Sequence, residues 1–430
     1  MNRKVHMIRI EKTLTQPVPS DIYTIGAPED VLFFDIETTG LSARSAGLYL
    51  IGMLTYTDKK WTLLQYFCED VADEPAVLQA FFELLRTKKT LISYNGDGFD
   101  IPFLRHMLEQ YGLPYSFDAV ESFDLFKKFR PLKRLLNLPD LKLKSCERFL
   151  GIDREDRFTG GELIEVYFEW QKTKVPALLD TLLLHNAEDI ANLPNLLPLL
   201  RYRALPHSDF QLRAHERLQD GDMPLVHLSF TLLSPMPPSA HTPAENDTHE
   251  MTDERGQHCP DAGENDDREM QNDCRQHWPD TRENDVREAQ DDRRQHWPSL
   301  ALPRPMDLRG DFWALHAEGS AVELYVQLFE GERKLFFADF EHYYYLPAED
   351  QVIHQSLAEF VDRSARKKAC ARNCYQRVSG CFLPEWSELY TPALQAEYRD
   401  KLRYAQYSDA LFDDAAKAAA YLKSFLQTAL

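Results

Sequence analysis

Residues 31–41 have the sequence VLFFDIETTGL, in which an apolar run leads directly into two acidic residues. A short apolar run of this kind is typical of a strand that is buried on both faces. Asp35 and Glu37 are two positions apart, so on a strand their side chains emerge on the same face, with roughly 7 Å between the Cα atoms. One interpretation is that Asp35 and Glu37 are ordinary surface acids at a strand end that turns to solvent; the other is that they bind a metal. Carboxylates crowded at the end of a buried sheet repel each other unless a cation compensates them. Hard oxygen ligands suit Mg²⁺ or Mn²⁺, so the pair is a candidate metal site.

A third acid stands in the segment YNGDGFDIPFL, residues 94–104. Asp100 lies between an expected strand at 90–94 and an expected helix at 101–111, and its alternative role is to cap that helix ahead of Pro102. Asp97 is the rival acid. We favour Asp100 because apolar residues beside it can anchor its backbone, whereas glycines flank Asp97.

The segment LLLHNAEDI, residues 182–190, has a helical pattern. His185 and Asp189 are four positions apart and so share one helix face. One helix would then present a metal ligand and a proton-handling group together. The alternative is a partly buried histidine with Asp189 as its surface partner.

The order of the elements around these segments predicts an α/β fold. Strands are expected at 31–34, 48–56 and 61–67, with a turn at 57–60 between the last two. A helix at 73–87, the strand at 90–94 and the helix at 101–111 follow, and helices then dominate to about residue 203. Three antiparallel strands, a helix, another strand and more helices is the element order of the ribonuclease-H-like mixed sheet with flanking helices.

The three segments together resemble the motifs of the DEDD 3′–5′ exonuclease superfamily. Over residues 29–203 the chain is most similar to its YprB-type ribonuclease-H-like family, and the segments 123–125, 141–151 and 157–161 also resemble that family. The resemblance implies that two ions, Mg²⁺ or Mn²⁺, are held by four acids: Asp35, Glu37, Asp100 and Asp189. It implies hydrolysis of terminal phosphodiester bonds in DNA or RNA, with an ion-activated water as the nucleophile.

The third segment departs from that superfamily in one position. Its members have tyrosine four residues before the last acid or histidine five before it, whereas here His185 is four before Asp189. His185 is therefore expected to be catalytic, either as a general base or as a group that orients the water.

The implied partner is nucleic acid, with a single-stranded 3′ end as the expected substrate. Basic residues cluster at 127–130, 133–134, 142 and 144, either as a groove that follows the strand or as a solvated helix face. An aromatic residue such as Tyr94 would stack on a base or belong to the core. The residues expected to contact nucleic acid are Thr38, Tyr94, Asn95, Lys127 and Lys128.

The net charge of −20 is unusual for a protein that binds phosphates. Residues 241–300 account for about half of it, since they contain 17 acidic and 7 basic residues. Within this tract three near-copies of one unit repeat every nineteen residues, at Glu245, Glu264 and Glu283. The units lack a continuous apolar seam, so we expect a disordered insertion.

The length of 430 residues predicts two cores. We expect an N-terminal extension at 1–28, the ribonuclease-H-like exonuclease domain at 29–203, and a smaller α+β domain at 204–430 interrupted at about 241–300. In that domain we expect a strand at 224–233, a hairpin formed by 321–329 and 334–340, and helices at 351–368, 391–404 and 412–428.

Other classes of protein are disfavoured by composition. Seven cysteines are an odd number without zinc-knuckle spacing, and Cys370, Cys374 and Cys381 lack a fourth partner for an iron–sulfur cluster. The first residues offer no apolar h-region and no later stretch reaches membrane-spanning length, so we expect a cytoplasmic protein that does not engage membranes. A non-catalytic nucleic-acid-binding or adaptor protein on the same scaffold is the main alternative, and an endonuclease is a less favoured one.

Overall fold

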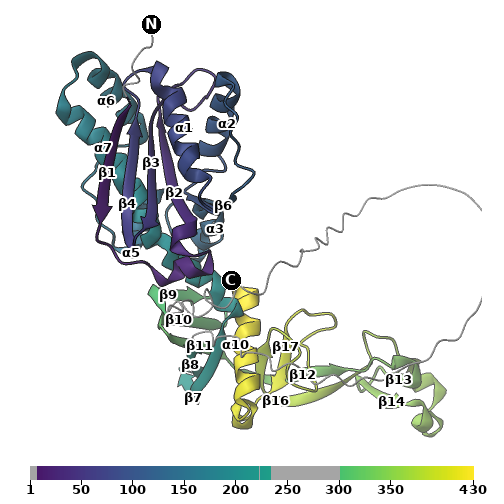
Figure 1. Ribbon diagram of the computed structural model, residues 1–430. Coiled ribbons are helices and arrows are strands. Elements are labelled where there is room, and N and C mark those ends of the chain that lie inside the picture. Colours follow the sequence, from purple (N-terminus) through teal and green to yellow (C-terminus); the bar gives the residue numbers. More distant parts are fainter. Residues whose placement is uncertain (1–6, 222, 234–300) are drawn as a thin grey trace, which may run out of the picture. The chain divides into compact units, whose positions relative to one another are not determined.

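A computed structural model describes residues 7–221, 223–233 and 301–430 (Figure 1). The expected repeat insertion at 241–300 lies outside these residues. Within the described ranges, no helix combines the length and the apolar character needed to cross a membrane.

The N-terminal part contains a six-stranded mixed sheet, as the sequence predicts. Its strand order is β1-β4-β3-β2-β5-β6. The first four strands in this order are antiparallel to one another, whereas β5 is parallel to both β2 and β6. The bounds are β1 (Ile8–Leu14), β2 (Val31–Thr38), β3 (Leu48–Thr57), β4 (Lys60–Phe67), β5 (Thr90–Ser93) and β6 (Glu121–Asp124).

The sheet contains one strand that the sequence does not predict and one turn that it does. β1 lies within the expected N-terminal extension at 1–28, yet it forms the edge strand beside β4. The expected turn between β3 and β4 is present, and Asp58 and Lys59 both have positive φ values, 50° and 60°. Two such residues form the tight turn whose twist matches that of the flanking strands.

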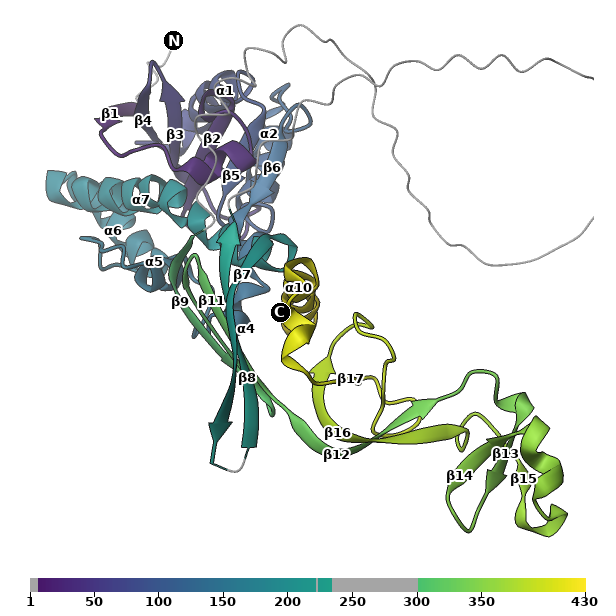
Figure 2. The same cartoon turned by 90° about the horizontal axis from the view of Figure 1, so that it is seen from below.

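Helices cover both faces of the sheet, and Figure 2 shows α1 and α2 on one side and α5, α6 and α7 on the other. Leu32 and Phe34 of β2 belong to the core beneath α1 and α2. Phe33, one position out of phase, packs in the same cluster as Ile190 of α7. Because a strand alternates its side chains, Asp35 and Glu37 lie on the α7 face. The helices are α1 (Glu74–Leu85), α2 (Asp100–Tyr111), α3 (Leu125–Phe129), α4 (Leu132–Leu135), α5 (Leu143–Leu150), α6 (Gly160–Thr173), α7 (Pro176–Leu196) and α8 (Leu200–Ala204).

Gly52 of β3 allows α7 to approach the sheet closely. A Cβ atom at this position would lie 2.0 Å from Asn186 Oδ1 and 2.0 Å from Ile190 Cδ1, both on α7. Gly52 is also the residue paired with Asp35 across the β2–β3 ladder. The missing side chain therefore lets α7 reach the sheet at the position of the first acid.

The C-terminal part contains a five-stranded antiparallel sheet of order β7-β8-β11-β10-β9. Buried and half-buried residues alternate along β8 and β11, as in a sheet with one face against a core. That core contains Phe425 of α10, whose ring lies 4.8 Å from the ring of Trp313. The elements are β7 (Asp209–Asp220), β8 (Met223–Leu233), β9 (Leu302–Arg309), β10 (Trp313–Gly319), β11 (Ala321–Gln327) and α10 (Ala415–Ala429). The expected strand at 224–233 and helix at 412–428 are thus confirmed.

Two small antiparallel sheets complete the described residues, with orders β12-β16-β17 and β14-β13-β15. The expected hairpin of 321–329 with 334–340 is wrong, because β11 pairs with β8 and β10 whereas β12 pairs with β16. Residues 330–333, which separate the two expected strands, lie inside β12, where Gly331 opposes Gly380. The strands are β12 (Phe329–Phe336), β13 (Tyr343–Leu346), β14 (Gln351–His354), β15 (Lys367–Lys368), β16 (Tyr375–Glu385) and β17 (Arg403–Gln406).

The helices expected at 351–368 and 391–404 are also wrong. The first range forms short strands and 3₁₀ turns, and the second forms loops and the start of β17. Leu357 and Phe360 of the expected apolar stripe are 52% and 78% exposed. An amphipathic helix is stabilised mainly by packing its apolar face, and these two apolar side chains remain largely exposed.

Candidate metal centre

Asp35 and Glu37 lie near the end of β2, on the face that α7 covers. Asp35 is half-buried and Glu37 is 9% exposed. Tyr49 of the neighbouring strand donates a hydrogen bond of 3.4 Å from its hydroxyl to Glu37 Oε2. The two acids are therefore held within the sheet rather than turned out to solvent.

Asp100 joins this pair through the backbone of β2. Its Oδ1 accepts a hydrogen bond of 3.1 Å from the backbone N–H of Ile36, the residue between the first two acids. Asp97, the rival acid, lies elsewhere and forms an ion pair of 2.6 Å with Lys127. The structure therefore places Asp100, and not Asp97, beside the acids of β2.

Helix α7 brings three further side chains to the same place. Asn186 Nδ2 donates to Asp35 Oδ2 at 3.1 Å, while its Oδ1 accepts from Gln65 of β4 at 3.0 Å. His185 Nε2 lies 3.7 Å from Glu37 Oε1 and 3.6 Å from Asp189 Oδ2. Glu37, His185 and Asp189 each offer a ligand atom, and these atoms lie within 4.8 Å of one another. The sequence-predicted acids and histidine thus gather from three separate segments.

Burial makes Asp35, Glu37 and Asp100 hard to ionise, and neighbouring like charges add to this effect at Asp35 and Glu37. Burial raises the pKa of Asp35 well above its usual range, and the like charges of Asp100, Glu37 and Asp189 raise it further. The pKa of Glu37 is raised by burial and then by Asp189 and Asp100. Burial raises the pKa of Asp100 to about 7. A bound divalent cation would reverse these shifts, so the donor set fits such an ion.

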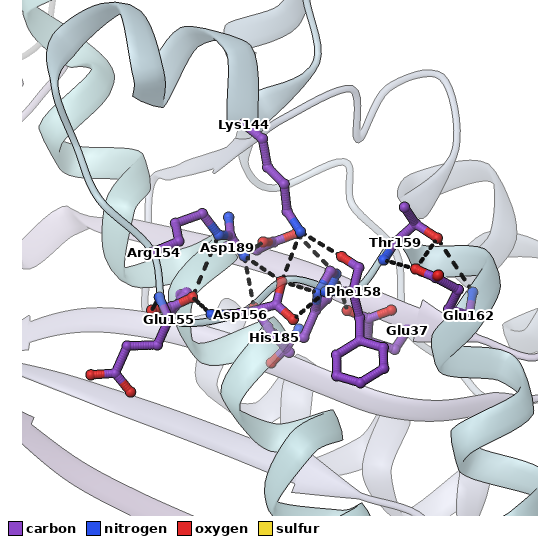
Figure 3. Close-up of polar contacts among 12 residues, drawn as sticks. Glu37, Lys144, Arg154, Glu155, Asp156, Phe158, Thr159, Glu162, His185 and Asp189 are labelled. Carbon is purple, nitrogen blue, oxygen red and sulfur yellow. Dashed lines mark hydrogen bonds and ion pairs between the residues drawn. The ribbon is translucent and has the colours of Figure 1, made fainter.

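A network that the sequence analysis missed surrounds His185 and Asp189 (Figure 3). Asp156, in the loop before α6, places Oδ2 2.8 Å from His185 Nδ1 and 2.8 Å from Lys144 Nζ. Arg154 forms ion pairs with Asp189 and with Glu147, the latter at 3.0 Å. The Arg154 side chain is 6% exposed, so these charges face each other away from bulk water.

The loop that carries Asp156 is fixed by α7. Glu188 accepts hydrogen bonds from the backbone N–H groups of Glu155 and Asp156, at 2.9 and 3.0 Å. Glu188, the residue before Asp189 on α7, therefore anchors the loop. No spacing in the sequence links Asp156 to His185, which is 29 residues away. Their contact becomes visible only in the fold.

The residues expected to contact nucleic acid lie in different environments. Lys127 is paired with Asp97, and Lys128 Nζ lies 4.8 Å from the centre of the Phe123 ring. Thr38 Oγ1 donates to the carbonyl of Gly40, and Asn95 adopts a positive φ of 66° beside β6. The Tyr94 hydroxyl donates to the carbonyl of Leu141 at 2.6 Å, and its ring packs against Phe126 and Phe129. Three of these residues, Tyr94, Lys127 and Lys128, thus have partners of their own within the domain.

The similarities to solved structures are low. The chain is 18% identical to the family B DNA polymerase from the hyperthermophilic archaeon Pyrobaculum calidifontis, with a TM-score of 0.33, over 42% of this chain and 25% of that one. It is 18% identical to a structure described as the apo form of a nuclease, with a TM-score of 0.28, over 42% of this chain and 75% of that one. It is 14% identical to the zinc-bound E. coli ExoI–ssDNA complex, with a TM-score of 0.25, over 47% of this chain and 54% of that one.

The chain thus spans a quarter of the polymerase chain and about half of the ExoI chain. The comparison with curated proteins found no match. Residues 32–201 match the model of the RNase_H superfamily. That range contains the mixed sheet from β2 to β6 and every residue of the acidic cluster, so this part of the chain is an RNase H-like domain.

Proposed function

We propose that this protein is a metal-dependent 3′–5′ exonuclease that hydrolyses terminal phosphodiester bonds of DNA or RNA. One observation carries the proposal: acids from β2, α2 and α7 converge on one place, where burial and the like charges of its neighbours raise the pKa of Asp35. A cluster of repelling carboxylates costs free energy, so a protein gains from it only when the acids hold cations.

Asp35, Glu37, Asp100 and Asp189 would hold two divalent ions, Mg²⁺ or Mn²⁺. Bound there, such ions would lower the pKa of a water molecule and stabilise the oxygen that leaves the phosphorus. The chain's own groups prepare the site. Asn186 orients Asp35 through a hydrogen bond of 3.1 Å, and the backbone N–H of Ile36 orients Asp100 at 3.1 Å.

The loop that carries Asp156 also offers an exposed ring that would contact the substrate. Phe158 in this loop is 40% exposed, and its backbone carbonyl accepts a hydrogen bond from Lys144. An exposed aromatic ring can stack on a base without selecting a sequence. Phe158 suits this role better than Tyr94, whose hydroxyl and ring are both engaged inside the domain.

One observation favours the second candidate, a non-catalytic protein that binds nucleic acid on the same scaffold. Arg154 already pairs with Asp189, so one acid of the cluster has a cationic partner from the protein itself. A scaffold that had lost its metals could keep its fold through such a pair.

The test is degradation of matched DNA and RNA oligonucleotides labelled at the 5′ end, with Mg²⁺, with Mn²⁺ and with a chelator. We expect a ladder of products that shortens from the 3′ end with either metal and disappears with the chelator. Asp35→Ala should reduce the rate by at least about 100-fold. Substitution of a residue that only hydrogen-bonds to a metal ligand already lowers metal affinity or activity by about 10- to 100-fold.

Asp97→Asn is the matched control, since Asp97 is an acid of the same domain whose ion pair with Lys127 keeps it apart from the cluster. It should retain the wild-type rate. Cuts inside the strand would contradict the exonuclease proposal and indicate an endonuclease. Binding of the oligonucleotides without any metal-dependent cleavage would favour the non-catalytic candidate.

A further inference from the structure

The two ring nitrogens of His185 have different surroundings. Nδ1 lies 2.8 Å from Asp156 Oδ2. No hydrogen bond from the described residues reaches Nε2, which lies 3.7 Å from Glu37 Oε1 and 3.6 Å from Asp189 Oδ2. The residue is 6% exposed, so Nε2 points into the acidic cluster and not into bulk water.

Asp156 determines which nitrogen carries the proton of a neutral ring. Its buried carboxyl group lies between two cations, with Oδ2 2.8 Å from Lys144 Nζ and 3.4 Å from Arg154 Nη2. Asp156 is therefore an anion that can only accept hydrogen bonds. The ring donates Nδ1–H to it, which leaves the lone pair of Nε2 directed at the acids.

The spacing of the three groups suits a shared ion. Two ligand atoms on one ion, each about 2.1 Å from it, are separated by roughly 3.0 to 3.5 Å. The separations of 3.6 and 3.7 Å around Nε2 exceed that range by only tenths of an ångström. Small side-chain movements would therefore bring Glu37, His185 and Asp189 onto one cation.

We propose that His185 is a direct metal ligand through Nε2, together with Glu37 and Asp189, and that this position takes a divalent transition metal such as Mn²⁺ or Co²⁺ in preference to Mg²⁺. Imidazole nitrogen suits first-row transition metals, whereas Mg²⁺ prefers oxygen ligands. Asp156 is then a positioning residue that holds the ring. The inference deepens the proposed function, because it concerns the same site. It also changes the role of His185, since a nitrogen bound to a metal has no lone pair with which to act as a general base.

Mn²⁺ itself is the probe for the test, because its electron spin reports on the atoms bound to it. The full chain is titrated with Mn²⁺, and electron spin-echo modulation is recorded to detect nitrogen coupled to the ion. We expect nitrogen modulation that changes when the histidines are labelled with ¹⁵N. Mg²⁺ should displace Mn²⁺ only at an excess of about tenfold or more. Bound Mn²⁺ without coupled nitrogen would overturn the proposal, as would the absence of Mn²⁺ binding.

Three variants sharpen the result. His185→Gln should abolish the nitrogen modulation and weaken Mn²⁺ binding by at least about tenfold. His106→Gln, a histidine of the same domain in the middle of α2, should leave both unchanged. Asp156→Asn should weaken Mn²⁺ binding by about tenfold while the nitrogen modulation persists. An unchanged affinity in Asp156→Asn would show that Asp156 does not position the ring.

Parallel digestion of oligonucleotides separates this inference from the proposed function. Nitrogen-coupled Mn²⁺ without any cleavage would refute the exonuclease and support the ligand assignment. Cleavage that proceeds equally well in Mg²⁺, with Mn²⁺ lacking nitrogen coupling, would support the exonuclease and overturn the ligand assignment.

Discussion

The two sides of the acidic cluster are held in place by different kinds of interaction. On the strand side, uncharged donors of the sheet and of α7 position the acids: the Ile36 N–H binds Asp100, and Gly52 lets Asn186 of α7 reach Asp35. On the loop side, charged side chains hold the site: Arg154 forms an ion pair with Asp189, and Asp156, paired with Lys144, binds His185.

This difference has consequences for how each side responds to change. A backbone contact depends on the sheet, which many residues determine together, so one substitution at an acid should leave the strand side in place. An ion-pair network depends on each of its members, because removing one leaves the others buried and unpaired. The loop side is therefore the more fragile of the two.

The largest expected effect comes from breaking the loop side. Arg154→Met removes the positive charge that faces Glu147 and Asp189, and the side chains of Arg154 and Glu147 are 6% and 1% exposed. Leaving buried charges without their partner typically costs about 3–5 kcal/mol. Urea denaturation of the metal-free protein should show this loss in the free energy of unfolding.

Arg157→Met is the control for that experiment, because Arg157 is an exposed arginine of the same loop. A surface substitution of this kind usually changes stability by less than about 0.5 kcal/mol. If Arg154→Met cost no more than its control, the loop would owe its conformation to something other than the ion pairs.

The same contrast explains what the sequence could predict of the site. Asp35 and Glu37 are two apart on one strand, and His185 and Asp189 are four apart on one helix, so local geometry places each pair correctly. Asp156 and Arg154 lie in a loop, where no periodicity relates them to other residues. Their roles depend on the fold bringing this loop against Glu188 of α7.

The fold was predictable to a similar extent and for a related reason. β2 is buried on both faces, and a continuous apolar run identifies such a strand. In the C-terminal part, residues around Leu357 and Phe360 have helical apolar spacing, yet both side chains are exposed. Spacing predicts a helix only where a core exists to cover the apolar face.

A pH-dependent effect of intermediate size should come from the strand side. The pKa of Asp100 is raised from 3.8 to about 7 because the carboxyl group is buried. A carboxyl group whose pKa is higher in the folded state stabilises the fold below its unfolded pKa, and this contribution is lost as the pH rises through the folded pKa. The metal-free wild type should therefore lose stability between about pH 4 and pH 7, by a few kcal/mol for a shift of this size.

Asp100→Asn removes that titration but retains an oxygen that can accept from the Ile36 N–H. Relative to the wild type, the variant should become more stable as the pH rises from 5 to 8, as measured by urea denaturation in a chelator. Added Mn²⁺ should stabilise the wild type at pH 8 more than the variant. A stability difference that does not vary with pH would contradict the burial of an ionisable Asp100.

The smallest of the three effects should come from the helix–sheet contact. Gly52→Ala places a Cβ atom where Asn186 Oδ1 and Ile190 Cδ1 lie, each 2.0 Å from it, so α7 must shift away from β3. Overpacking of this kind typically costs about 1–3 kcal/mol. Because Asn186 binds Asp35, the shift should also weaken Mn²⁺ binding, measured by titration.

Gly161→Ala in α6 is the control, since no atom lies within 4 Å of its added Cβ, and there alanine should leave metal binding unchanged. A Gly52→Ala variant that unfolds like the wild type and keeps its metal affinity would show that close contact between α7 and β3 does not position the first acid.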